Sequence, residues 1–286
     1  MERYYRFADI IFCITGNDND MYLEDGVLAP FRVDGPEFDH SIHYEIVEHL
    51  PKPEGECVFR GERIMVFRNG DNQITCMGDT FLLPEGAHTQ IHRQGTETRV
   101  QVLRKEVPDR IGPRLVLNTL EAEHHIVCRG GFLLHSSFIR VGDKGILFTA
   151  PSGTGKSTQA ELWQKYRGAE VINGDRAAVI PTEEGVLAYG IPYSGTSGIC
   201  HNAKLPVAAI VHLAQAPENR IEALRGLRAF RRVWEGCSVN VWDKEDVDRC
   251  TNSVLETIRQ VPVIHLACTP DETAVQTLEQ YLRREI

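Results

Sequence analysis

The hydrophobic pattern divides the chain into two parts of different character. Up to about residue 107, short apolar runs alternate with polar turns, which predicts β-strands within 3–14, 43–50 and 62–78. Within the last of these, Asn69-Gly70 stands between two apolar runs, a strong signal for a β-hairpin. From about residue 130, strands alternate with helices, which is typical of an α/β core with a mixed sheet. We therefore expect a β-rich region at 1–107 and an α/β core at 108–286.

Helical patterns connect and complete these parts. A helix is predicted over 110–127, with Pro113 in its first turn, where a missing N–H is tolerated. Near the end of the chain, the pattern predicts a helix over 245–260, a strand over 261–268 and a last helix that begins at 269–272.

Composition narrows the class of partner. The 286 residues are 42% hydrophobic, and 31 Lys and Arg stand against 40 Asp and Glu, for a formal charge of -9. This balance argues against nucleic acid as a partner, because such binding needs a basic surface. No apolar run is long enough to span a membrane, and Asp9 interrupts the short N-terminal one, so we expect neither a signal peptide nor a membrane partner. Eight scattered cysteines without a Cys-x-x-Cys pair indicate reduced thiols and a cytoplasmic protein.

A glycine-rich loop carries the clearest chemistry. Residues 145–163 read GILFTAPSGTGKSTQAELW, an apolar strand, a loop and a helix, and Ala150–Ser157 fits the P-loop pattern with Ala in the first glycine position. Glycines let backbone N–H groups curl around an anion, Lys156 would reach the β- and γ-phosphates, and the Ser157 hydroxyl would ligate Mg²⁺. We therefore predict that ATP and Mg²⁺ bind here, with the phosphates held by Ser152, Gly153, Thr154, Gly155, Lys156, Ser157 and Thr158.

The strand before this loop is predicted to be the second arm of a hairpin. FLLHSSFIRV and GILFTA flank a tight turn, and with Asp143-Lys144 as its two loop residues His135 would face Ser152. The ring of His135 would then lie at the mouth of the loop. The alternative is a histidine with a purely local role at the end of a strand.

An acidic residue is predicted at the same edge of the sheet. The helix after the loop leads to the strand AEVIN and then to Gly174-Asp175-Arg176. Because a strand–helix–strand crossover returns parallel, Asp175 should emerge beside the loop. A carboxylate there can hold Mg²⁺ or accept the proton of an attacking hydroxyl, although an ordinary turn Asp is the simpler interpretation. We predict His135, Lys156 and Asp175 as catalytic residues, with Ser157 and Asp175 as metal ligands.

At these residues the chain resembles the HPr kinase/phosphorylase family and its relative, phosphoenolpyruvate carboxykinase. The resemblance rests on the strand ending in His135, the hairpin into APSGTGKST and the strand end INGDRAAV, and it covers about residues 130–200. The chain looks closer still to the HPr-kinase-like proteins found beside ribosomally made peptide clusters, some of which phosphorylate serine. The resemblance implies a mixed-sheet P-loop kinase core, ATP and Mg²⁺, a homo-oligomer, and a His135 beside the transferring phosphoryl group.

Two departures from that family change the picture. The family commonly has two adjacent acids where this chain has Gly174-Asp175. The single carboxylate of Asp175 must therefore either bind the metal or accept the proton, do both through a water molecule, or be assisted by His135. Residues 190–206 also differ from the family's loop for its protein substrate, so HPr is not the expected acceptor. Here the hydroxyls and amides of Ser194–Gly198 would close over the γ-phosphate or orient an acceptor, with His201 and Lys204 nearby, or form a polar connecting loop.

Other polar clusters in the sequence are weaker indications of a functional site. The histidine pairs His40/His43, His88/His92 and His124/His125 suggest zinc, but the first two lie in strand or loop sequence and no cysteine pair completes a tetrahedral site. Arg231, Arg232 and Trp234 would contact a phosphate or adenine, or form an exposed helix face.

The leading hypothesis is an ATP-dependent phosphotransferase that moves the γ-phosphoryl group to a hydroxyl, serine of a peptide or protein, with residues 1–107 selecting the acceptor. A small-molecule hydroxyl kinase and a catalytically weak nucleotide-binding regulatory module are the alternatives.

Overall fold

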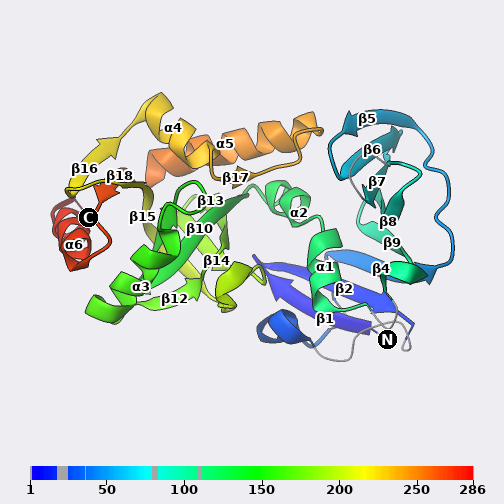
Figure 1. Cartoon of the computed structure of the whole chain (residues 1–286), viewed down its shortest axis with the longest axis horizontal. Helices are drawn as coiled ribbons and strands as arrows, with labels where there is room; N and C mark the ends of the chain where they lie inside the picture. The colour runs from blue at the N-terminus through cyan, green and yellow to red at the C-terminus, as the bar shows by residue number, and fades with distance from the viewer. Residues whose placement is uncertain (1, 18–24, 36, 79–82, 108–110, 286) are drawn as a thin grey trace. The chain divides into compact units, whose positions relative to one another are not determined.

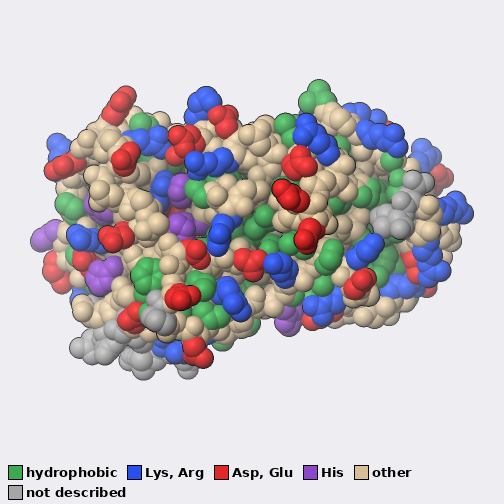
Figure 2. All heavy atoms as spheres, turned by 180° about the vertical axis from the view of Figure 1, so that it is seen from behind, with side chains coloured by type: hydrophobic (Ala, Val, Ile, Leu, Met, Phe, Trp, Pro, Cys, Tyr) green, Lys and Arg blue, Asp and Glu red, His purple; other side chains and the backbone are tan. Residues whose placement is uncertain are grey.

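The computed structural model describes residues 2–17, 25–35, 37–78, 83–107 and 111–285. The chain divides into two compact units, Met1–Glu121 and Ala122–Ile286 (Figure 1). The sequence predicts a boundary between residues 107 and 108, at the start of the segment 108–110, which lies outside the described residues. Acidic and basic side chains lie interspersed on the face shown in Figure 2. Within the described ranges, no helix combines the length and the apolar character needed to cross a bilayer.

The first unit is built around one sheet. Its strands run in the order β3-β1-β2-β4-β9-β8-β7-β6-β5, with β4 parallel to both β2 and β9 and the other neighbours antiparallel. Rings from Phe7, Phe12 and Phe31 pack together in its core. The strands are β1 (Glu2–Phe7), β2 (Ile10–Gly16), β3 (Arg32–Val33), β4 (His40–Val47), β5 (Glu56–Arg60), β6 (Ile64–Asn69), β7 (Asn72–Gly78), β8 (Ala87–Gln94) and β9 (Glu97–Leu103), with short helices η1 (Gly26–Phe31) and η2 (Arg104–Glu106).

The structure confirms the predicted hairpin near Asn69-Gly70, with a small shift. Asn69 pairs with Asn72, so the two loop residues are Gly70 and Asp71. Gly70 has a φ of 58°, a backbone conformation that glycine adopts without a steric penalty. The glycine therefore fixes the first position of the turn.

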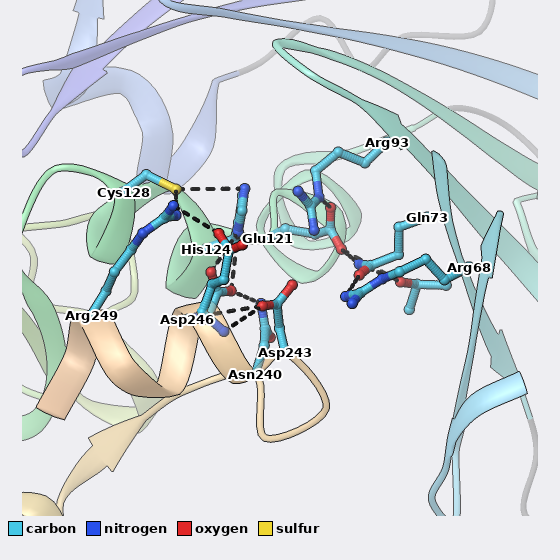
Figure 3. Close-up of polar contacts among 12 residues, drawn as sticks. Arg68, Gln73, Arg93, Glu121, His124, Cys128, Asn240, Asp243, Asp246 and Arg249 are labelled. Atoms are coloured by element: carbon cyan, nitrogen blue, oxygen red, sulfur yellow. Dashed lines mark hydrogen bonds and ion pairs between the residues drawn. The ribbon is translucent and has the colours of Figure 1, made fainter. Parts of the chain in front are cut away.

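The predicted single helix over 110–127 is wrong. The chain forms two helices, α1 (Pro113–Thr119) and α2 (Ala122–Cys128), and Arg110 lies outside the described residues. Pro113 is in the first turn of α1, as predicted. Glu121 breaks the helix with a φ of 50°, and its carboxylate accepts hydrogen bonds from Arg93 Nε (3.1 Å) and Gln73 Nε2 (3.3 Å) (Figure 3). A paired, half-buried carboxylate thus outweighs local helix propensity at this position.

Two long strands organise the second unit. β10 (Phe132–Val141) and β15 (Lys204–Gln215) each pair in two sheets. In one sheet, β11, β15 and β18 run parallel, with β10 and β16 antiparallel at their flanks; in the other, β10, β13, β14 and β15 run antiparallel. This confirms the predicted mixed sheet. The remaining strands are β11 (Lys144–Thr149), β12 (Glu170–Asn173), β13 (Arg176–Thr182), β14 (Gly185–Gly190), β16 (Arg220–Leu224), β17 (Cys237–Ser238) and β18 (Val263–Cys268).

Helices cover both faces of the parallel strands (Figure 1). Side chains alternate along β11, so that Ile146 and Phe148 join a buried cluster with Trp163 of α3, while Leu147 joins the cluster that contains Val254 of α5. The helices on the two faces are α3 (Lys156–Arg167), α4 (Gly226–Trp234), α5 (Lys244–Gln260) and α6 (Glu272–Glu285). The parallel strands are therefore packed against buried side chains on both faces.

The β10–β11 hairpin corrects the predicted register. Val141 pairs with Lys144 and Ser136 with Thr149, so the loop residues are Gly142-Asp143 and not Asp143-Lys144. Gly142, with a φ of 61°, takes the first loop position, where a type II′ turn needs glycine. Since the partner on β11 shifts by two positions, each β10 side chain keeps its face. His135 lies beyond the last β10–β11 pair, Ser136 with Thr149, and is not paired with Ser152; its strand partner is Arg176 of β13, on the other side of β10.

A histidine pair, with His212 buried and His265 half-buried, predicts how stability depends on pH. His212 Nδ1 lies 3.1 Å from His265 Nδ1, and burial, followed by the charges of Arg232 and His265, lowers the pKa of His212 to about 4. Because the unfolded histidine takes its proton near pH 6.5, stability should fall as pH drops from 6.5 towards 4, by about 2 kcal/mol for this group.

Urea unfolding at pH 7 and pH 4.5 checks this. We expect His212→Asn to lose less stability between the two pH values than the wild type. His201→Asn, a change at an exposed histidine of the same unit, should follow the wild type. An identical pH dependence in all three proteins would contradict the prediction.

Candidate functional site

The loop between β11 and α3 has the geometry of an anion cradle. Gly153 and Gly155 have φ values of 76° and 117°, and Gly155 caps the first turn of α3. Glycine reaches these angles without strain, so the loop can turn its backbone N–H groups towards one centre. The amino-terminal end of a 12-residue helix adds its own N–H groups and positive dipole.

Lys156 lies at the base of this loop. Its side chain is buried, and Nζ donates hydrogen bonds to the carbonyl oxygens of Ala150 (2.9 Å) and Pro151 (3.4 Å). Burial lowers the pKa of Lys156, while the nearby charge of Asp175 opposes that shift. The seven residues predicted to hold phosphate, 152–158, therefore form one continuous segment around a buried cation, and the hydroxyl-bearing Ser157 is exposed.

Asp175 meets His135 across the neighbouring strands. Asp175 Oδ1 lies 3.4 Å from His135 Nε2, and Oδ2 lies 3.5 Å from Arg176 Nε. The contact with His135 lowers the pKa of Asp175; burial opposes this, and the charges of Arg176, His135 and Lys156 add to it. The structure thus brings the three predicted catalytic side chains to one edge of the sheet, with the Asp175 carboxylate between the His135 imidazole and the Arg176 guanidinium.

Asn173, which the sequence analysis did not single out, holds the turn that carries Asp175. Its side chain is fully buried, and Oδ1 accepts hydrogen bonds from the N–H groups of Asp175 (2.9 Å) and Arg176 (3.0 Å). Its Nδ2 donates to the carbonyl of Ile191 at 2.7 Å. An Asn at a strand end followed by Gly-Asp is a sequence signal for such an Asx turn.

The Ser194–Gly198 loop packs directly against the Asp175 turn. A Cβ on Gly174 would lie 2.1 Å from Ser197 Oγ and 2.7 Å from Ser197 Cβ, and one on Gly195 would lie 2.8 Å from Asp175 Cβ. Real Cβ atoms do not approach so closely, so both glycines are needed for this contact. The loop therefore lies against the candidate acid, where the position of a second carboxylate at residue 174 is already filled.

The polar residues after this loop make contacts of their own. The His201 backbone N–H donates to the carbonyl of Ile172 at 2.9 Å, and the Lys204 ammonium lies 5.2 Å from the centre of the Tyr189 ring. Both residues thus have structural contacts that do not involve Asp175.

This packing gives a steric prediction. Gly174→Ala should destabilise the second unit by about 1–3 kcal/mol, because the new methyl group overlaps Ser197 Cβ and the backbone must move. In a Ser197→Gly background the same change should cost far less, since the next atom, the Ser194 carbonyl oxygen, lies 3.8 Å away. A double-mutant cycle by urea unfolding measures this coupling. Additive effects of the two changes would contradict the contact.

A pocket of about 300 Å³ lies beside the glycine-rich loop. Gln215, at the end of β15, donates to the loop carbonyls of Gly153 (3.5 Å) and Thr154 (3.4 Å) and forms part of its wall. The pocket is lined by Gly153, Thr154, Gly155, Thr158, Gln159, Leu213, Gln215, Ala216, Cys268, Thr269 and Pro270.

The α4 side chains considered for phosphate or adenine have local partners. Arg231 Nε and Arg232 Nη1 pair with the Glu235 carboxylate at 2.9 and 3.1 Å, and the Trp234 ring stacks on Phe230 with centroids 5.6 Å apart. These contacts are typical of a charged helix face.

Comparisons with known proteins add little to this picture. No family model matches the sequence, and no curated protein matches it either. Among solved structures, the fold is similar to the Hpr(Ser) kinase/phosphatase from Coxiella burnetii, at 13% identity and a TM-score of 0.34, over 54% of this chain and 97% of that one. Similarity this low says nothing about what the present chain binds or does.

Proposed function

We propose that this protein is an ATP-dependent kinase that transfers the γ-phosphoryl group to a hydroxyl, serine of a peptide or protein. The observation that carries the proposal is the meeting of three elements at one sheet edge: the glycine-rich loop, the buried Lys156 beneath it, and Asp175 in contact with His135. Phosphoryl transfer needs positioned charge more than covalent chemistry, and this edge supplies such charge.

The donor set fits ATP and Mg²⁺. In the proposed assignment the loop amides and Lys156 bind the phosphates, and the Ser157 hydroxyl and the Asp175 carboxylate supply oxygen ligands of the kind that Mg²⁺ prefers. When bound, Mg²⁺ neutralises charge on the β- and γ-phosphates. The lowered pKa of Asp175 suits a carboxylate that stays ionised as a ligand, and it makes Asp175 a weak base. We therefore assign the acceptor proton to His135.

The nucleoside is assigned to the pocket of about 300 Å³ beside the loop, because its lining is continuous with residues 153–158. The first unit is assigned to acceptor recognition. It contains a groove of about 860 Å³ between 48–53, 84–90 and 103–105, wide enough for a peptide side chain and its neighbours.

Transfer of label from ATP tests the proposal. The protein is incubated with γ-labelled ATP, Mg²⁺ and a library of serine-containing peptides, and label is measured on peptide, on small hydroxyl compounds and in water. Label on peptide supports the proposal. Label confined to small hydroxyl compounds favours the small-molecule kinase, and Mg²⁺-dependent ATP binding without any transfer favours the regulatory module.

A further inference from the structure

A second polar cluster lies in the same unit, between α2 and α5. Cys128 is the last residue of α2, and His124 lies one turn before it on the same face of the helix. Asp246 and Arg249 face them from the first two turns of α5. Figure 3 shows the four side chains pointing towards one another, with Asn240 beside Asp246.

The hydrogen bonds of this cluster fix the orientation of the His124 ring. Both oxygens of the Asp246 carboxylate lie 3.0 Å from His124 Nδ1, and Oδ2 accepts a further hydrogen bond from Asn240 Nδ2 at 3.0 Å. Asp246 is 1% exposed, so its position is fixed by these partners. A carboxylate on Nδ1 selects the tautomer with its proton there, which leaves Nε2 as the nitrogen that faces Cys128 Sγ, at 3.7 Å.

A guanidinium completes the surroundings of the sulfur. Arg249 Nη1 donates to Cys128 Sγ at 3.0 Å, and its Nη2 is held by Glu245 Oε2 at 3.0 Å. Burial raises the pKa of the Cys128 thiol, but the hydrogen bond and charge of His124 and the charge of Arg249 outweigh it, and the net shift is downward. The sulfur is nevertheless reachable, because Cys128 is exposed.

A metal ion fits this cluster poorly, although His124, Cys128 and Asp246 lie within 4.8 Å of one another. The Asp246 carboxylate is hydrogen-bonded to His124 Nδ1, so it orients the imidazole and is not itself available as a metal ligand. That leaves Nε2 and Sγ as two ligands, where zinc takes three or four from protein. The Arg249 guanidinium on the sulfur would also repel a cation.

We propose that Cys128 is a modification site, a reactive thiolate that small hydroperoxides oxidise. The sulfur attacks one oxygen of the peroxide; an S–O bond forms, the O–O bond breaks, and the leaving alkoxide or hydroxide takes up a proton from solvent. Sulfur loses two electrons and becomes a sulfenic acid, and the peroxide gains them. His124 and Arg249 favour the anionic sulfur that this attack requires.

Alkylation rates give the first test, with Cys57 as the comparison inside the same molecule. Cys57 is also exposed, but its sulfur lies 3.5 Å from the carbonyl of Phe59. With iodoacetamide at pH 6.5, followed by peptide mass spectrometry, we expect Cys128 to react roughly tenfold faster than Cys57 and to keep its rate to lower pH.

Variants on α2 and α5 separate activation from simple exposure. His124→Gln and Arg249→Gln should bring Cys128 close to the rate of Cys57 and move its pH profile upward, whereas Arg259→Gln, an exposed arginine on the same helix paired with Glu256, should change neither. Cys250, which is buried on α5 of the same unit, should stay unreactive in each variant, and this shows that the fold is retained.

Treatment with hydrogen peroxide and a sulfenic-acid probe completes the experiment. We expect a probe adduct at Cys128 in the wild type and a severalfold smaller one in Arg249→Gln. Equal alkylation of the two cysteines, no adduct at Cys128, or equimolar zinc binding that blocks both reactions would overturn the proposal.

Discussion

Asp175→Asn is expected to lower the rate of phosphoryl transfer by about 10²- to 10³-fold, the range found when one group that stabilises transition-state charge is removed. The amide keeps the shape of the side chain but loses the negative charge, which faces His135 at 3.4 Å and Arg176 at 3.5 Å. Because the loop and Lys156 remain, ATP should still bind. Rates with γ-labelled ATP, together with ATP affinity from calorimetry, distinguish a loss of chemistry from a loss of binding.

Asp248→Asn is the matched control for this change. Asp248 is an exposed carboxylate of the same unit, paired with Lys244 on the surface of α5. Its conversion to an amide should leave the rate within a factor of about two, as for most surface substitutions. Full activity in Asp175→Asn would place the chemistry elsewhere in the protein, even if ATP binding near the loop is retained.

Lys156→Met should weaken ATP binding by about 10- to 150-fold. The reason is the loss of hydrogen bonds between a buried ammonium and charged phosphates, worth about 1.5–3 kcal/mol. Methionine has a similar length, so the packing at the base of the loop changes little, although the carbonyls of Ala150 and Pro151 lose their donor. Calorimetric titration with ATP and with adenosine measures the effect.

Adenosine is the internal control, because it has no phosphate for Lys156 to contact. Its affinity should be the same in wild type and Lys156→Met. Lys165→Met gives a second control on the same helix, where the ammonium lies exposed over the Tyr166 ring. An ATP affinity that is equal in all three proteins would mean that the loop does not hold the β- and γ-phosphates.

Much of the geometry could be predicted because it depends on contiguous segments and one rule of topology. The strand, loop and helix of residues 145–163 are read directly from the sequence. The parallel return of the strand–helix–strand crossover then places Asp175 at the same edge, and the hairpin brings His135 there. The structure has these two side chains in contact, a pairing that the sequence analysis did not specify.

Other features depend on contacts that no local pattern encodes. Glu121 splits the predicted helix because its carboxylate pairs with Arg93, far away in the sequence. The hairpin register follows from the single position at which Gly142 enters the turn. Cys128 and His124 share a helix face that the sequence shows, but Asp246 joins them from a different helix. Propensity and periodicity contain no information on such partners.

The close approach of residue 174 to Ser197 also limits the order in which substitutions can accumulate at these two positions. A side chain introduced at 174 while Ser197 is present overlaps that residue, whereas loss of the Ser197 side chain first leaves space for the new Cβ atom. The two substitutions are therefore epistatic and have a preferred order, with the change in the loop at 197 before the change in the turn at 174.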